Sequence, residues 1–107
     1  MLTAEIHQEA LQAAKTAVAE HRIKHGNQFF GCGFAWVTCY EKGNTKLGKS
    51  FIKQGFTKNY DGGYKLWDPA NTGSQCVMEK EAGAQAYCET VRKYLPEVKL
   101  YPNSRLD

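Results

Sequence analysis

Apolar residues follow a helical repeat near both ends of the chain. Between residues 3 and 25, alanines and larger aliphatic side chains return every three or four positions, which predicts an amphipathic helix. Thr3 is a suitable N-cap for this helix, and Gly26 is a suitable C-terminal stop. A second run with the same spacing covers residues 79 to 95 and ends at Pro96, so we expect a second long helix there.

Alternating patterns in the remaining segments predict strands. Residues 32 to 40 are apolar on both faces, which is typical of a central strand that is buried on both sides. Residues 63 to 68 and the short segment 98 to 101 also alternate and predict two further strands. Residues 57 to 63 predict a loop because they end in an Asp-Gly-Gly turn signal, and residues 102 to 107 predict a polar tail.

The segment from 46 to 55 fits two descriptions. Leu47, Phe51 and Ile52 suit one face of a short helix, and a strand is the alternative. The preferred element order is therefore α-β-(α)-β-α-β. We expect an α+β fold, formed by residues 1–107 as one compact domain, in which a small sheet packs against the two long helices. The sheet has three strands, or four if residues 46 to 55 are extended.

Two glycines bracket Cys32 at the beginning of the predicted central strand. On a strand that is apolar on both faces, the missing side chain of Gly33 indicates that a helix or a ligand lies close to the backbone. The small residues 83 to 86 of the second long helix are the expected partner in the first case.

The composition is that of an ordinary folded domain. Of the 107 residues, 42% are hydrophobic and 23% are charged, which excludes a disordered chain. No apolar run approaches the roughly 20 residues of a membrane-spanning helix, so we expect no membrane partner. The N-terminus lacks the regions of a signal peptide, and we place the protein in the cytoplasm. The net charge of +3 is too small to indicate nucleic acid by itself.

Cysteine and histidine residues do not form a recognisable metal motif. No C-x2-C pair occurs, and Cys32 and Cys39 face opposite sides of a regular strand. His21 and His25 have the spacing of half a zinc site on a helix, but no HExxH pattern accompanies them. In a cytoplasmic protein we expect all four cysteines to remain thiols, and we predict neither a metal nor a cofactor.

Two other classes of function receive less support. An enzyme that pairs Cys32 or Cys39 with a histidine is one alternative, but no nucleophile motif or phosphate loop is present, so we predict no catalysis. A double-stranded RNA-binding domain requires a strand at residues 46 to 55 and a dense lysine cluster at its last helix. Here Lys80 stands between two glutamates, so nucleic acid is not the expected partner.

Aromatic residues on the predicted strands have polar and basic residues close to them in sequence. Trp36 and Trp67 lie on two different predicted strands, and Arg105 lies near the chain end. Flat rings beside hydrogen-bond donors suit a nucleobase joined to phosphate, because the ring stacks on the base and the cation holds the charge. The alternative is that both tryptophans belong to the core and that the basic residues are merely solvated.

Four segments together resemble a group of small bacteriophage-encoded proteins without an assigned activity. The resemblance extends over most of the chain, and its segments are CGFAWV (32–37), WDPANTGSQ (67–75), KEAGAQAY (80–87) and SRLD (104–107). The phage proteins have Pro where this chain has Gly31 and Asn where it has Asp68. The resemblance therefore implies that an ordinary negative φ is acceptable at Gly31, which then needs no special explanation.

The resemblance implies a phage accessory protein that acts against host defence in the host-cell cytoplasm. Small phage proteins of this kind sequester a nucleotide-derived signal molecule or bind a host defence protein. We predict sequestration of a nucleotide-like ligand without catalysis, with a protein–protein inhibitor as the alternative, and a homodimer would complete such a site. The predicted ligand-binding residues are Gly33, Trp36, Trp67, Asn71, Lys80, Ser104 and Arg105.

Overall fold

The α+β class predicted from the sequence is confirmed. A computed structural model describes residues 1–26, 31–59, 61–72 and 76–106. Within them, helices and strands follow one another in the order α1 (Ala4–His25), β1 (Gly33–Cys39), α2 (Lys46–Lys53), β2 (Thr57–Lys58), β3 (Tyr64–Trp67), α3 (Val77–Tyr94) and β4 (Leu100–Leu106). None of the helices in these residues is both long and apolar enough to cross a lipid bilayer.

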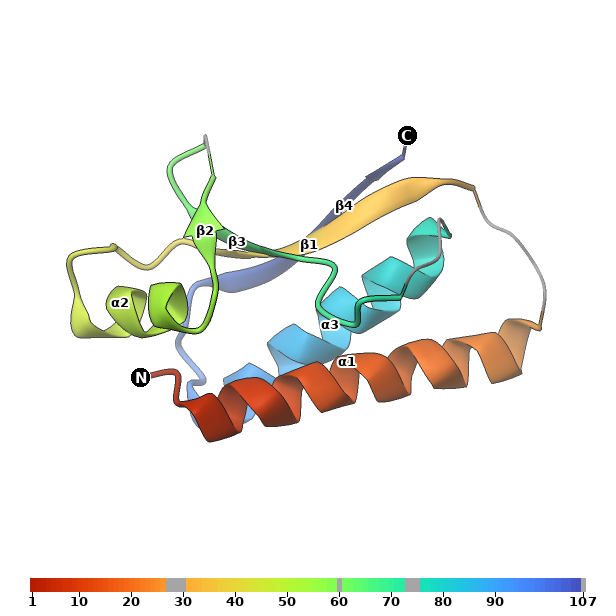
Figure 1. Cartoon of the computed structure of the whole chain (residues 1–107), viewed down its shortest axis with the longest axis horizontal. Coiled ribbons are helices and arrows are strands. Elements are labelled where there is room, and N and C mark those ends of the chain that lie inside the picture. Colours follow the sequence, from red (N-terminus) through yellow and green to blue (C-terminus); the bar gives the residue numbers. More distant parts are fainter. Residues whose placement is uncertain (27–30, 60, 73–75, 107) are drawn as a thin grey trace.

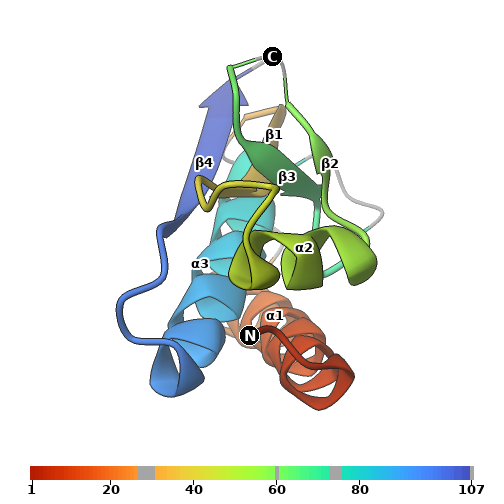
Figure 2. The same ribbon diagram turned by 90° about the vertical axis from the view of Figure 1, so that its left-hand side faces the viewer.

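The strands form one antiparallel sheet with β1 in a central position. The strand order is β2-β3-β1-β4, and β1 pairs with both β3 and β4, so the prediction of a central strand is confirmed. From β1 onward the element order β-α-β-β-α-β is that of a split β-α-β fold, to which α1 is added in front. Figure 2 shows the strands above α1 and α3 when the molecule is viewed from one end.

The first helix begins and ends as its sequence predicts. The Thr3 side chain accepts a hydrogen bond from the Ile6 backbone N–H at 3.2 Å, which satisfies one of the amides left unpaired at a helix start. At the other end, Gly26 has a φ of 61° and its N–H donates to the Arg22 carbonyl oxygen at 2.8 Å. The small side chains that α1 buries let it lie beside α3 (Figure 1), and they are Ala10, Ala14 and Val18.

Both long helices lie on the same side of the sheet (Figure 1), with α3 packed against β1 and β4 and with α1 packed against α3. The β1 residues on that face, Ala35, Val37 and Cys39, are each 0% exposed and belong to the core. Phe34 and Trp36 alternate with them and are half-buried on the opposite face, over which Figure 1 shows no helix among the described residues. The prediction that β1 is buried on both sides is therefore wrong at Phe34 and Trp36, whereas Thr38 on the same face is 1% exposed. We call the side that carries Phe34 and Trp36 the open face of the sheet.

The last strand is longer than its sequence pattern predicts. β4 continues to Leu106, so the predicted polar tail at 102–107 is wrong as far as residue 106. The strand pairs with the whole length of β1 and lies at the edge of the sheet. An edge position tolerates Pro102, because one side of an edge strand has no pairing partner. It also lets the strand carry polar side chains that face solvent, so its sequence lacks the apolar alternation by which strands are recognised.

The middle of the chain supplies a helix and a fourth strand. Residues 46–53 form α2, so the preferred prediction of a short helix is confirmed. The fourth strand comes from Thr57–Lys58, a segment predicted to be a loop, and pairs with β3. Because the segment at 46–53 is not a strand, the α-β-β-β-α order of a double-stranded RNA-binding domain is not present.

Gly31 and Gly33 are required for different reasons. Gly31 has a φ of 102°, so the interpretation that this glycine needs no special explanation is wrong, and a proline cannot adopt this conformation. At Gly33, an added Cβ would lie 2.5 Å from the Arg105 carbonyl oxygen and 2.8 Å from Val77 Cγ2, which leaves no room for a side chain. A helix therefore approaches Gly33, but through Val77 in the first turn of α3. The expected partner segment 83 to 86 is not the one in contact, and its Gly83 packs toward α1 and the turn after β3.

Candidate functional site

The open face of the sheet carries three aromatic rings in contact. Trp36 on β1 lies directly opposite Trp67 on β3, so both side chains lie on the same face. Their ring centroids are 5.6 Å apart and their planes are 10° from parallel. Phe34, two residues before Trp36, has its ring centroid 5.3 Å from that of Trp67. We call Phe34, Trp36 and Trp67 the aromatic row.

The rings of this row remain accessible. Trp67 is 49% exposed, and the other two rings are half-buried. The alternative that both tryptophans belong to the core is therefore wrong for Trp67. An exposed indole beside a second indole offers an apolar flank, and such a surface suits stacking by a flat ligand.

Three cationic side chains surround the aromatic row. Lys65 Nζ lies 5.5 Å from the centroid of the Trp67 ring, at one end of the row. At the other end, Lys80 Nζ lies 5.0 Å and the Arg105 guanidinium carbon 6.0 Å from the centroid of the Phe34 ring. These distances are within the range of about 6 Å over which a cation is attracted to an aromatic face. The row is therefore apolar in the middle and positively charged at both ends.

Lys80 reaches the row from α3. It is 8% exposed, and its ammonium group donates to the Gly33 carbonyl oxygen at 3.1 Å. The Ala35 carbonyl oxygen lies on the same edge of β1 and accepts from the Asp68 backbone N–H at 3.1 Å. Lys80 therefore binds a carbonyl oxygen of β1 just beyond the end of β3, where the described residues provide no strand partner to bind it. No carboxylate of a described residue forms an ion pair with Lys80. A buried cation in this situation favours an anion nearby.

A shallow hollow lies beside the rings. Its volume is about 160 Å³, and it is lined by Trp36, Asn59, Lys65, Trp67 and Arg105. Typical small-molecule pockets begin at about 300 Å³, so this hollow holds part of a ligand and not the whole of it. Hollows of about 610 Å³ and 830 Å³ lie along α1, but their described linings are aliphatic and polar without an aromatic ring. Chemistry rather than size therefore singles out the open face.

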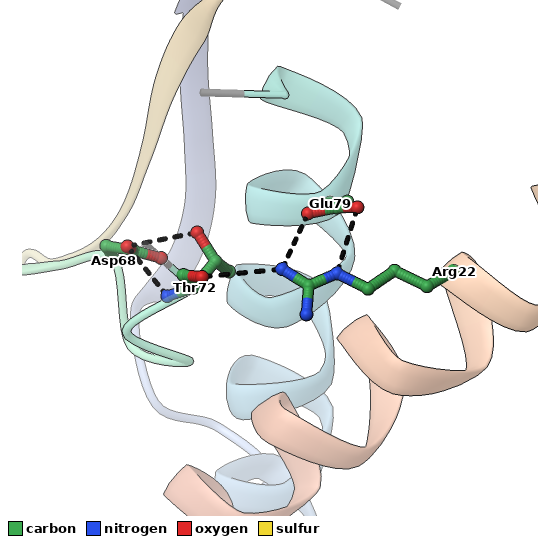
Figure 3. A network of polar contacts seen from close by, with 4 residues as sticks. All are labelled: Arg22, Asp68, Thr72 and Glu79. Atoms are coloured by element: carbon green, nitrogen blue, oxygen red, sulfur yellow. Dashed lines mark hydrogen bonds and ion pairs between the residues drawn. The ribbon is translucent and has the colours of Figure 1, made fainter. Parts of the chain in front are cut away.

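A polar network holds the turn that follows Trp67 (Figure 3). Arg22 Nε and Nη2 donate to the two carboxylate oxygens of Glu79, each at 3.1 Å. Nη2 also donates to the Thr72 carbonyl oxygen at 3.3 Å, and Asp68 Oδ2 accepts from the Thr72 backbone N–H at 3.1 Å. The network joins the end of α1, the first turn of α3 and the turn after β3. It therefore holds the turn that begins directly after Trp67.

Five of the seven predicted site residues come together. Trp36, Trp67 and Arg105 line the hollow, and Gly33 and Lys80 are joined by a hydrogen bond at the Phe34 end of the row. These residues are far apart in sequence, and the register of β3, β1 and β4 is what places the first three side by side.

The other two predicted residues lie elsewhere. Asn71 occupies the turn after β3 with a φ of 51°, and its N–H donates to the Asp68 carbonyl oxygen at 2.8 Å. Ser104 lies opposite Ala35, so its side chain points toward the helices, where its hydroxyl donates to Glu81. Neither residue is placed at the aromatic row.

Sequence reasoning missed three residues at the site. Phe34 and Lys65 each lie two positions from a tryptophan on the same strand, so the two-residue period of a strand was the signal that could have found them. Asn59, which is 8% exposed, comes from the segment between β2 and β3 and carries no such signal.

The cysteines and histidines lie outside the aromatic row. Cys39 is fully buried, and burial raises the pKa of its thiol to about 11, which makes it a poor nucleophile. The rings of His21 and His25 have their centroids 4.4 Å apart. Among the described residues, no group of three or more His, Cys, Asp or Glu side chains is arranged to hold a metal ion.

Comparisons with known proteins give no match. The sequence matches no protein-family model and no curated protein, and the fold matches no solved structure. The resemblance to phage-encoded proteins therefore stays a prediction. The side chains of the open face are the basis from which a function is inferred.

Proposed function

We propose that this protein binds a nucleotide-derived small molecule on the open face of its sheet and sequesters it without catalysis. The base stacks on the aromatic row, and the phosphate groups lie toward the cations. The observation that carries this proposal is three contacting rings on the open face of a sheet whose other face is covered by helices. Stacking of a base on an aromatic side chain is worth about 1–3 kcal/mol, so the rings supply a substantial part of the affinity.

The cations give the ligand a direction. Arg105 is exposed, and its planar guanidinium can bind a phosphate through two hydrogen bonds. Lys80 adds a buried positive charge at the same end, 5.0 Å from the Phe34 ring. Lys65 lies at the opposite end of the row. A ligand with two separated phosphate groups, or two linked nucleotides, matches this arrangement better than a free base does.

The small size of the hollow supports a homodimer. A hollow of about 160 Å³ leaves most of a nucleotide in solvent. A second copy of the chain, placed with its own aromatic row against the same ligand, would enclose it by a two-fold symmetric contact. The homodimer is tested by native mass spectrometry, in which the ligand should increase the fraction of dimer.

The phage origin and the role against host defence are inferred from the resemblance of four sequence segments to phage-encoded proteins. A protein that removes a signal molecule needs affinity and abundance in the host cytoplasm but no reaction. A host defence protein that docks on Trp67 is the alternative partner, since exposed tryptophans are frequent anchors of protein interfaces.

Single-stranded nucleic acid is a second candidate ligand, and the topology favours it. The order β-α-β-β-α-β from β1 onward puts the aromatic row on the two central strands of a four-stranded sheet. RNA-recognition motifs stack two or three bases on the aromatic side chains of such a sheet. This is an analogy at the level of the fold, and the small net charge of +3 gives it no further support.

Titration calorimetry with a matched pair of variants tests the proposal. The ligands are cyclic dinucleotides, isomers of cyclic ADP-ribose and a short single-stranded oligonucleotide. We expect Trp67→Ala to weaken binding by about tenfold or more, because one base loses its stacking partner. Tyr94→Ala is the control, since Tyr94 is also 49% exposed but lies on α3 and should leave the affinity unchanged.

The outcomes separate the candidates. Binding of a small nucleotide that depends on Trp67 supports sequestration, and binding of the oligonucleotide alone supports the second candidate. The proposal is contradicted if no ligand binds at millimolar concentration, or if the Trp67 and Tyr94 variants bind equally well. Chemical change of the bound ligand on incubation would contradict the absence of catalysis.

A further inference from the structure

Two cysteines face each other across a β-bridge at the beginning of β1. Cys32 immediately precedes Gly33, Cys76 is the residue before α3, and the two form an antiparallel bridge. All four cysteines of the chain are thiols in this structure. We infer that Cys32 and Cys76 are an oxidation site, at which a low-molecular-weight disulfide such as oxidised glutathione converts the two thiols into an intramolecular disulfide.

The type of bridge is what makes this pair suitable. The Val77 backbone N–H donates to the Gly31 carbonyl oxygen at 3.1 Å, so this bond joins the residue after Cys76 to the residue before Cys32. In an antiparallel pair, this pattern puts the two cysteines at a non-hydrogen-bonded position. There the Cα atoms are about 4.5 Å apart and the side chains are at their closest. Disulfides span Cα separations of about 4.4–6.8 Å, so the bond closes with little backbone movement.

The two remaining cysteines, Cys39 and Cys88, are poor sites of oxidation. Cys39 and Cys88 are each 0% exposed, and burial raises the pKa of their thiols to about 11 and about 12. Thiol–disulfide exchange requires a thiolate that an oxidant can reach. Cys32 is half-buried and Cys76 is 4% exposed, so the oxidant meets Cys32 first. Cys76 is then the cysteine that resolves the mixed disulfide.

The reaction has two exchange steps. The Cys32 thiolate attacks one sulfur of oxidised glutathione, which forms a mixed disulfide and releases one glutathione thiolate. The Cys76 thiolate attacks the Cys32 sulfur, forms the protein disulfide and releases the second glutathione thiolate. Two cysteines are oxidised and one glutathione disulfide is reduced, and the protons lost by the two cysteines go to the two released glutathione thiolates.

The crosslink joins the beginning of β1 to the first turn of α3. These are the elements that carry Gly33 and Lys80, whose hydrogen bond borders the Phe34 end of the aromatic row. The disulfide also closes a long loop of the chain, from residue 32 to residue 76. A crosslink over a loop of this length restricts the unfolded state, so oxidation should raise the thermal midpoint by about 5 °C or more.

Peptide mapping of the folded protein after exposure to oxidised glutathione tests the inference. We expect a single crosslinked species in which the peptides of Cys32 and Cys76 are joined, while Cys39 and Cys88 are recovered as thiols after unfolding. The matched control is the double variant Cys39→Ala/Cys88→Ala, which removes the two buried thiols and should still crosslink. Cys32→Ser and Cys76→Ser should each abolish the crosslink.

The wild-type protein provides a readout that does not depend on the folding of any variant. Its oxidised form should unfold at a higher temperature than its reduced form, and reduction with dithiothreitol should reverse the shift. Recovery of four thiols after exposure, a glutathione adduct that persists on Cys32, or a crosslink between two chains would each overturn the inference.

Discussion

The two faces of β1 both carry apolar side chains, but these differ in size and shape. Toward the helices stand Ala35, Val37 and Cys39, which are small and fully buried. Toward the open face stand Phe34 and Trp36, which are large, flat and half-buried. Small side chains let the helices approach closely, whereas the rings cover the open face themselves. Apolar residues on both sides of a strand therefore indicate burial on both sides only when their sizes suit the packing of a second layer.

The largest expected effect is a difference in stability between two substitutions on β4, one on each face of the sheet. Leu100 and Arg105 both belong to β4, but Leu100 is 0% exposed on the helix-covered side, and Arg105 lies opposite Phe34. Leu100→Ala should lower the free energy of unfolding by about 2–5 kcal/mol, because it leaves a cavity in the core. Arg105→Ala should change the free energy by about 0.5 kcal/mol or less. Urea denaturation measures both, and equal losses would break the comparison.

A second substitution tests the close approach of α3 to the covered face. Gly33→Ala should lower the free energy of unfolding by about 1–3 kcal/mol, since the added methyl group meets the Arg105 carbonyl oxygen and Val77. The double variant Gly33→Ala/Val77→Ala should lose less than the sum of the two single variants, because one of the two clashes is removed. Unchanged stability of Gly33→Ala would show that the backbone is not confined there.

A smaller effect is expected where the covered side supports the open face. Arg22→Ala removes the bonds to Glu79 and Thr72, and it should cost about 0.2–1 kcal/mol, because the Arg22 side chain is 49% exposed and screened by solvent. The matched control is Arg22→Lys, which keeps the charge but loses the paired hydrogen bonds. Urea denaturation measures the loss. The indole N–H signal of Trp67 in a nitrogen–proton correlation spectrum should shift in Arg22→Ala, and an unchanged signal would mean that the network does not position this ring.

The smallest expected effect is a pH dependence that belongs to the covered side. His7 is 6% exposed, its Nδ1 lies 2.7 Å from the Tyr87 hydroxyl oxygen, and burial lowers the pKa of His7. The unfolded chain, with a pKa of about 6.5 for this residue, therefore binds a proton before the folded protein does. Stability should be constant above that pH and fall as the pH decreases toward the lowered pKa of the folded state.

A variant of His7 isolates this contribution. His7→Gln retains a hydrogen-bonding group but does not titrate. The decrease in the free energy of unfolding that begins below a pH of about 6.5 should therefore be absent from its stability profile. Urea denaturation at a series of pH values gives both profiles. Parallel profiles for the wild type and His7→Gln would assign the acid sensitivity to other groups.

Strong periodicity made the long elements predictable, whereas β4 was hidden. The capping of α1 by Thr3 and the central position of β1 both follow from local patterns. β4 was missed beyond residue 101 because its pairing partner, and not its own hydrophobicity, makes it a strand. An edge strand with one solvent-facing side has little apolar pattern to detect.

The candidate site was predictable by residue type but not by arrangement. Trp36, Trp67 and Arg105 stand out in the sequence because rings and cations suit a nucleotide. Which of them share a face depends on strand register, which no local pattern gives. The same limitation placed Ser104 at the site, although its position opposite Ala35 turns it toward the helices.

The indole N–H signals of Trp36 and Trp67 in a nitrogen–proton correlation spectrum provide the most direct test of the open face as a binding site. The chain has 2 tryptophans, so each signal reports on one ring of the aromatic row. Titration with a cyclic dinucleotide or an ADP-ribose isomer should shift both signals together, whereas ribose 5-phosphate, which lacks a base, should shift neither. Signals that stay in place with every base-containing ligand at saturating concentration would contradict the account.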